Sequence, residues 1–244
     1  MKQLGGICRP VVFPVVLMNT WVRTLVNHRQ ETSLAAKVRR KRFDLFLRLA
    51  SAFPPPIHVL DIGGEQRFWE VMGLAGNPSF QFVILNIIEP EITFSNFRKI
   101  TGDATNMHDI ADGEFEIAFS NSVIEHLGTY ARQDKMAQEI RRVGQSYFIQ
   151  TPNKHFPIEP HFLVPFFQYF PMGLKISMVQ RLNLGWYQKI PDQEKAREHI
   201  LSHRLLTESE MRTLFPNGKL FKERILGLTK SFIAYGGRLD ITGI

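Results

Sequence analysis

The sequence contains a single cysteine, Cys8, among 244 residues. A disulfide framework within the chain is therefore excluded, and so is a structural zinc site built from several cysteines. No stretch of 18 consecutive apolar residues occurs, so a transmembrane helix is not expected. The apolar run Val11–Met18 contains Pro14 and lacks a small-residue cleavage site after it, which disfavours a secretory signal peptide. These absences favour a cytoplasmic location.

Patterns that would identify several other enzyme classes are also missing. No G-x-G-x-x-G pattern follows the first expected strand, which disfavours a nicotinamide-dependent oxidoreductase. The fourth expected strand ends in Ser120-Asn121-Ser122, in place of the Asn/Asp-Pro-Pro-aromatic motif of DNA amino-methylating enzymes. Cys8 lies outside the expected sheet, so a cytosine-attacking thiol is missing as well. Nucleic acid is therefore not the expected partner, although a net charge of +7 favours anionic ones.

Much of the positive charge lies in Lys37–Arg48, before the first expected strand. We interpret this run as the solvated face of an N-terminal helix; the alternative is contact with a phosphate-rich partner or, peripherally, an anionic membrane. Val11–Val26 is expected to form a helix that covers part of the core or makes contact in a homodimer. The consecutive prolines Pro54 to Pro56 must end the helical region. The chain thus divides into an N-terminal helical extension, residues 1–56, and a main domain, residues 57–244.

In the main domain, short apolar runs alternate with helix-like stretches, which predicts a mostly parallel sheet covered on both faces. Helices are expected at Arg67–Ala75 and Ala131–Val143. Five strands are expected at Ile57–Ile62, Phe82–Ile87, Arg98–Ile100, Phe115–Ser120 and Ser146–Gln150.

The C-terminal part follows a different pattern. Thr207–Phe215 is predicted to be a helix with a capping box, in which Thr207 is the N-cap and Glu210 lies three residues on. Lys219–Gly227 and Ser231–Tyr235 are separated by only a few residues, so they must form an antiparallel hairpin. The fold class is therefore α/β, a doubly wound seven-stranded sheet with this hairpin at its end. A helical insertion of about residues 154–206 precedes it.

Polar or small residues end each expected strand. In an open α/β sheet, ligands bind beyond the carboxyl ends of the strands. Glycines there let a ligand approach the backbone closely, and polar side chains can hydrogen-bond to it. The candidate ligand-binding residues are Asp61, Gly63, Gly64, Asn86, Asp103, Ala104, Asn121 and Ser122.

Several segments resemble one known family. The chain is similar to the class I S-adenosylmethionine-dependent methyltransferases, especially methyltransferase type 11. The resemblance covers Ile57–Asn153 and the last thirty or so residues, and the fourth-strand run is its most specific part. The matching segments are VLDIGG (Val59–Gly64), GDAT (Gly102–Thr105), DGEFEIAFSNSVIEHLG (Asp112–Gly128), QTPN (Gln150–Asn153) and RILGLTKSFIAYG (Arg224–Gly236).

The resemblance implies S-adenosyl-L-methionine as cofactor and assigns a role to each strand end. Asp61, Gly63 and Gly64 would line the methionine and ribose portion. Asn86 would meet the ribose hydroxyls, and Asp103, followed by Ala104, the adenine. At the methionine end, near the transferred methyl group, the resemblance places Asn121 and Ser122.

The chain departs from the family pattern at three positions. The D-x-G-x-G-x-G motif keeps only its first glycine, because Glu65 and Arg67 replace the later two. The acidic residue expected at the end of the second strand is Asn86, whose amide lacks the charge-assisted strength of a carboxylate. These changes favour the alternative function, a non-catalytic binding or assembly protein that keeps the fold.

The acceptor side offers candidates for a general base, which is needed only for a hydroxyl or a protonated amine. They are Glu125, His126, His155, Glu159 and His161, and we expect His126 and His161 to be catalytic. The alternatives are helix packing for His126 and a surface or structural role for His155, Glu159 and His161. Their spacing shows no repeated ligand pattern, so no metal site is expected.

The first half of the insertion, HFPIEPHFLVPFFQYFPMGL, is dense in aromatic residues and proline. Above an active face, such a segment would form a lid or acceptor pocket. The expected acceptor is a small molecule, such as a saccharide, a lipid-linked compound or a quinone-like compound. The alternatives are the core of the insertion itself, a dimer contact, or docking on a membrane surface.

Overall fold

The computed structural model describes residues 34–237 and contains a seven-stranded sheet with the order β3-β2-β1-β4-β5-β7-β6. The first five strands pair in parallel, and β7 is antiparallel to both of its neighbours. This confirms the predicted fold class, including the C-terminal hairpin. The strands are β1 (Ile57–Ile62), β2 (Phe80–Asn86), β3 (Phe97–Thr101), β4 (Phe115–Asn121), β5 (Gly144–Pro152), β6 (Lys219–Ile225) and β7 (Leu228–Gly237).

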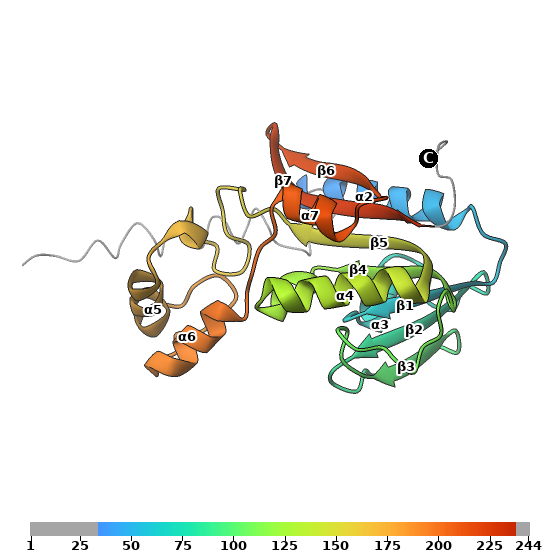
Figure 1. Cartoon of the computed structure of the whole chain (residues 1–244), viewed down its shortest axis with the longest axis horizontal. Helices are drawn as coiled ribbons and strands as arrows, with labels where there is room; N and C mark the ends of the chain where they lie inside the picture. Colours follow the sequence, from blue (N-terminus) through green and yellow to red (C-terminus); the bar gives the residue numbers. More distant parts are fainter. Residues whose placement is uncertain (1–33, 238–244) are drawn as a thin grey trace, which may run out of the picture.

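Helices cover both faces of the sheet, so the apolar side chains of its central strands are buried on either side (Figure 1). On one face, α2 (Leu34–Ala50) and α3 (Gln66–Val71) complete one buried apolar cluster. On the other face, α4 (Tyr130–Val143) and α7 (Glu208–Leu214) complete a second.

The helix that precedes the prolines is part of the main core. The ring of Phe46 in α2 lies 5.3 Å from that of Trp69 and contacts rings of the sheet. Those rings belong to Phe80, Phe119 and Phe148, at centroid distances between 5.4 and 6.4 Å. The basic run is therefore only partly a solvated face: Lys41 and Arg48 are exposed, while the apolar side of α2 is buried.

The insertion forms a lobe beyond the carboxyl ends of the strands, at the left of Figure 1. Its helices are η2 (Phe167–Tyr169), α5 (Met172–Arg181) and α6 (Gln193–Leu201). Phe162 and Phe167 lie in a separate apolar cluster with residues of α5 and α6, so these two rings form the core of the insertion. Within residues 34–237, no helix is long and apolar enough to cross a membrane.

Most predicted boundaries are confirmed to within a few residues, and the capping box of Thr207 and Glu210 is present. The helix expected at Arg67–Ala75 is wrong at its end, because α3 stops at Val71 and Gly73 has a φ of +75°. The predicted helix Val11–Val26 and Cys8 lie outside the described residues.

Candidate functional site

The polar strand ends meet at one edge and on one face of the sheet. Asp61 in β1 pairs with Ile84 of β2 and Phe119 of β4. Asn86 and Asn121 each lie two residues beyond these partners, and residues two apart in a strand share a face. That face is the one covered by α2 and α3.

The turn after β1 needs glycine at two positions. Gly63 has a φ of +75°, and a Cβ there would lie 2.6 Å from Cγ1 of Val123. A Cβ on Gly64 would lie 1.8 Å from Oδ2 of Asp61. The amide of Asn86 donates a hydrogen bond of 3.3 Å to the carbonyl oxygen of Gly64. Atoms of Val123 and Asp61 thus fill the space where a side chain at either glycine would stand.

Asp61 lies beneath this turn, with a residue exposure of 1%. Its Oδ2 accepts a hydrogen bond of 2.7 Å from the indole Nε1 of Trp69, whereas Oδ1 has no hydrogen-bond partner among the described residues. Burial disfavours the charged carboxylate and raises the pKa of Asp61 to about 7. Trp69 is a partner that the sequence pattern did not indicate.

The two residues that replace motif glycines do not obstruct the turn. Glu65 has an extended backbone with a φ of −139°, so its position does not require glycine. Glu65 and Arg67 are both exposed. Between them, the buried Gln66 accepts hydrogen bonds of 2.7 and 3.2 Å from the backbone N–H groups of Thr93 and Phe94. Gln66, which sequence reasoning missed, therefore links α3 to the segment after β2.

Asp103 lies at the same edge, because the N–H of Gly102 donates to the carbonyl oxygen of Asn86 at 2.9 Å. Oδ1 of Asp103 accepts from both the backbone N–H and the hydroxyl of Thr105, each at 2.8 Å. Oδ2 pairs with Arg132 at 3.1 Å. The backbone hydrogen bond from Thr105 is the main cause that lowers the pKa of Asp103. Ala104 is buried in the core on the α4 side.

Asn121 and Ser122 end β4 with different partners. Oδ1 of Asn121 accepts a hydrogen bond of 2.5 Å from Nη1 of Arg42, a residue of α2 that sequence reasoning assigned only to a basic run. Ser122 is exposed, has a φ of 58°, and donates from its hydroxyl to Oε1 of Gln150 at 2.8 Å.

A second group of polar residues begins with η1 (Ile124–Leu127), directly after β4. Glu125 is fully buried, and its Oε2 accepts a hydrogen bond of 3.0 Å from the hydroxyl of Thr151. Burial raises the pKa of Glu125 to about 7, although His161 opposes this shift. The carboxyl group thus interacts electrostatically with His161.

The structure brings together His126 and His161, the two histidines expected to be catalytic, and adds His203. Their ring centroids lie 4.9 Å (His126–His161), 4.9 Å (His126–His203) and 4.5 Å (His161–His203) apart. Nδ1 of His161 lies 2.7 Å from Oε1 of Glu159. His155 does not join them: it is exposed and bonded to the hydroxyl of Tyr169 at 2.7 Å. His203 follows α6 far along the chain, so no spacing pattern linked it to the others.

The three imidazoles differ in their charge states. Burial opposes the charged form of His161, but the hydrogen bond and charge of Glu159, with Glu125, outweigh it and raise the pKa of His161. Partial desolvation and the neighbouring His161 lower the pKa of His126 and of His203 to about 4. Near neutral pH, His126 and His203 are therefore uncharged.

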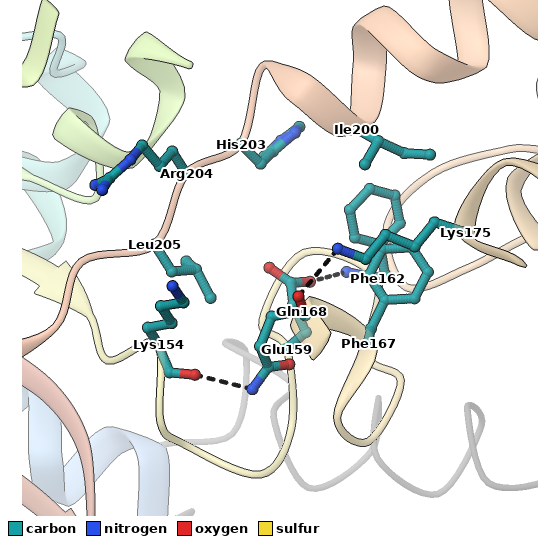
Figure 2. Close-up of a pocket in the computed structure, with 10 residues that line it drawn as sticks. All are labelled: Lys154, Glu159, Phe162, Phe167, Gln168, Lys175, Ile200, His203, Arg204 and Leu205. Atoms are coloured by element: carbon teal, nitrogen blue, oxygen red, sulfur yellow. Dashed lines mark hydrogen bonds between the residues drawn. The ribbon is translucent and has the colours of Figure 1, made fainter. Parts of the chain in front are cut away.

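A pocket of about 190 Å³ lies between the insertion and the segment that follows α6 (Figure 2). It presents apolar rings together with cationic side chains, and Nζ of Lys175 donates to the carbonyl oxygen of Gln168 at 3.0 Å. The lining residues are Lys154, Glu159, Phe162, Phe167, Gln168, Lys175, Ile200, His203, Arg204 and Leu205.

No known family model matches the chain. Two curated proteins of Mycobacterium tuberculosis, Uncharacterized protein Rv1509 of strain H37Rv and Uncharacterized protein MT1557 of strain CDC 1551, are each 38% identical to it over 58 residues. This match covers 24% of the chain and 20% of each relative. It therefore concerns about a fifth of their length, and neither name states an activity.

Solved structures match a much larger share of the chain. A "possible exported protein" from Bordetella parapertussis has a TM-score of 0.52 and 12% identity, over 90% of this chain and 79% of that one. The 1,6-didemethyltoxoflavin-N1-methyltransferase of Burkholderia thailandensis, solved with S-adenosylhomocysteine, has a TM-score of 0.48 and 14% identity, over 96% and 92%. Such identities show the fold alone. The seven-stranded sheet with its terminal antiparallel strand is the fold that the resemblance to the class I S-adenosylmethionine-dependent methyltransferases implies.

Proposed function

We propose that the protein is an S-adenosylmethionine-dependent methyltransferase that acts on a small-molecule acceptor. One observation carries the proposal: the turn of Gly63 and Gly64 has no room for a side chain and lies beside Asn86 and Asp103 at one sheet edge. A turn without side chains of its own, flanked by an amide and a carboxylate, suits a nucleoside with a charged amino-acid tail.

Each of these groups would hold a different part of the cofactor. The Gly63–Gly64 turn would lie against the methionine and ribose portion. Asn86 already donates its amide N–H to Gly64, so its Oδ1 is the atom that would accept a ribose hydroxyl. Oδ2 of Asp103 would accept a hydrogen bond from the adenine amino group. In the structure this oxygen pairs with Arg132. Ser122, exposed beyond β4, would lie near the reacting end.

The bound cofactor supplies an electrophilic methyl group on a sulfonium, which transfers by in-line displacement. Holding the acceptor atom in line with that bond supplies much of the rate. A hydroxyl acceptor must also lose a proton, and His126 or His161 would accept it at a ring nitrogen. His126 follows β4, and His161 lies in the insertion that follows β5.

The pocket of the insertion would hold the acceptor. The rings of Phe162 and Phe167 suit a flat or apolar portion, and Lys154 and Lys175 suit an oxygen-rich or anionic one. This combination supports the acceptor classes proposed from the sequence: a saccharide, a lipid-linked or a quinone-like compound.

A non-catalytic binding or assembly protein is the second candidate, and a specific observation favours it. Protein groups already occupy the strand-end side chains: Arg42 bonds to Asn121, and Arg132 bonds to Asp103. These contacts would compete with a cofactor for the same oxygens.

Calorimetric titration with S-adenosylmethionine separates the two candidates. We expect one cofactor bound per chain, with an affinity at least tenfold weaker in the Asp103→Ala variant. Asp109→Ala is the matched control, because this exposed carboxylate lies nearby in the chain and outside the proposed site. Absence of binding by the unaltered chain would favour the non-catalytic protein, and equal affinities in all three chains would contradict the proposed position of the adenine.

An acceptor screen with a labelled methyl donor then tests turnover. If His161 accepts the proton, a His161→Gln variant should bind S-adenosylmethionine normally and show a lower kcat with the acceptor found. A kcat unchanged by this variant and by His126→Gln would exclude both histidines as the base.

A further inference from the structure

We propose that His126, His161 and His203 form a binding site for one divalent transition metal ion of the zinc class. One potential ligand atom from each residue lies within 4.8 Å of the others. Imidazole nitrogens are ligands that zinc and its neighbours in the transition series prefer, whereas calcium and magnesium prefer oxygen. The sequence alone led us to expect no metal, because these three residues come from separate segments of the chain.

The hydrogen bonds behind two of the rings support this assignment. A histidine that binds a metal almost always donates its other ring N–H to a carboxylate or a backbone carbonyl. Nδ1 of His161 faces the carboxylate of Glu159 at 2.7 Å, and Nδ1 of His203 faces the carbonyl oxygen of His199 at 2.8 Å. These oxygens only accept, so both Nδ1 atoms carry hydrogen, and the lone pair of each ring in its neutral form is at Nε2. A metal ion that binds His161 displaces the proton that the charged ring carries there.

Glu159 is itself held rigidly in place. Its Oε2 accepts from the backbone N–H groups of His161 and Phe162, at 2.8 and 2.6 Å, and the residue is 3% exposed. The orientation of the His161 ring is therefore fixed by a buried carboxylate. Negative charge at Glu159 and at the buried Glu125 would also offset the charge of a bound cation.

Metal binding requires limited movement of the side chains. Tetrahedral nitrogen ligands at about 2.1 Å from zinc lie about 3.4 Å apart, so the cluster must contract. His126 is exposed and can move inward. The hydroxyl of Tyr187, now 2.9 Å from Nε2 of His203, must release that lone pair.

The site would join three parts of the fold. His126 belongs to η1, His161 to the insertion, and His203 to the segment between α6 and α7. A metal ion would therefore fasten the insertion to the sheet domain and stabilise the folded chain. His203 also lines the pocket, so an open coordination position would be reached from there. The inference does not depend on the proposed methyl transfer. While the metal ion is bound, however, neither His126 nor His161 can be the base, because the ion takes the lone pairs that a base needs.

The test uses the full chain after removal of metal with a chelator. Titration with Co²⁺ should give visible absorption bands that saturate at one ion per chain, and Zn²⁺ should abolish them. Zn²⁺ should also raise the Tm, whereas Mg²⁺ at the same concentration should not. His126→Ala should weaken Co²⁺ binding at least tenfold. Because His126 is exposed, the variant should keep its fold, which circular dichroism checks.

His155→Ala is the matched control, because His155 is exposed, as His126 is, and lies outside the cluster. It should leave the Co²⁺ spectrum and affinity unchanged. Failure of the unaltered chain to bind Co²⁺, or equal binding by the His126→Ala and His155→Ala variants, would overturn the proposal. Titration with S-adenosylmethionine is a separate measurement, so either proposal can fail without the other.

Discussion

Arg42 in α2 and Glu223 in β6 form a two-point ion pair. Nε of Arg42 donates to Oε1 at 2.9 Å, and Nη2 donates to Oε2 at 2.6 Å. The Glu223 side chain is 1% exposed, and the hydroxyl of Ser231 in β7 also donates to it. Since Arg42 contacts Asn121 as well, one guanidinium links α2, the C-terminal hairpin and the end of β4.

Replacing Arg42 with alanine should destabilise the protein strongly. The substitution leaves the carboxylate of Glu223 buried without its cation, and breaking a buried pair in this way costs about 3–5 kcal/mol. The free energy of unfolding, measured in urea, should fall by this amount. Arg48→Ala, an exposed position of the same helix, should change it by less than about 0.5 kcal/mol.

Neutralising Glu223, the partner of Arg42, tests whether the buried charge causes the loss of stability. The double variant Arg42→Ala/Glu223→Gln should recover part of the lost stability, because no uncompensated charge remains buried. A single variant as stable as the Arg48→Ala control would show that the pair is not needed.

Replacing Gly63 with alanine should disrupt the turn after β1. The added Cβ meets Val123 at 2.6 Å, in a backbone conformation with a φ of +75°. We expect a loss of about 1–3 kcal/mol in stability and weaker binding of S-adenosylmethionine. Chemical denaturation and calorimetry measure the two effects.

Replacing the neighbouring Val123 separates the side-chain clash from the backbone strain. In a Val123→Ala background the side-chain clash is relieved and the backbone strain stays, so Gly63→Ala should cost less there. Gly173→Ala, in α5 with open space around it, should be neutral or stabilising. Equal costs in both backgrounds would mean that the contact with Val123 is unimportant.

The buried carboxyl of Asp61 should make stability depend on pH. Its pKa is raised by burial to about 7 from 3.8, so between these values the folded chain keeps a proton that the unfolded chain releases. Stability contributed by the protonated form is therefore lost as the pH rises from about 4 to 7. Relative to an Asp61→Asn variant, the unaltered protein should lose up to about 4 kcal/mol across this range.

Urea unfolding of both chains at several pH values between about 4 and 8 measures this difference. A buried amide in the variant adds a cost that is the same at every pH, so the slope is the informative quantity. Asp109→Asn, on an exposed carboxyl, serves as control. Parallel curves for the unaltered protein and Asp61→Asn would show that Asp61 does not titrate in this range.

Local sequence patterns predicted most of the fold. Near-continuous apolar runs identified the parallel strands, and the short spacing between Lys219–Gly227 and Ser231–Tyr235 required the hairpin, because these signals depend on neighbouring residues. The end of α3 was missed because a glycine inside a helical pattern is ambiguous until its φ is known.

The site was predictable where it follows from strand ends and not where it depends on distant contacts. Gly63, Gly64, Asn86 and Asp103 come together because parallel strands share an edge. The contact of Arg42 with Asn121 and the approach of His203 to His161 are tertiary contacts between remote segments. No local periodicity encodes such contacts. Charge and composition therefore gave neither Arg42 nor His203 a role in the site.

The ring of Phe46, inserted among the aromatic side chains of the sheet, makes α2 indispensable. A shortened chain beginning at Ile57 would contain every proposed cofactor residue and still leave Trp69, Phe119 and Phe148 facing water on one side. Exposed apolar surface of that kind promotes self-association. The prolines that mark a border in the sequence therefore do not mark a place where the protein can be cut.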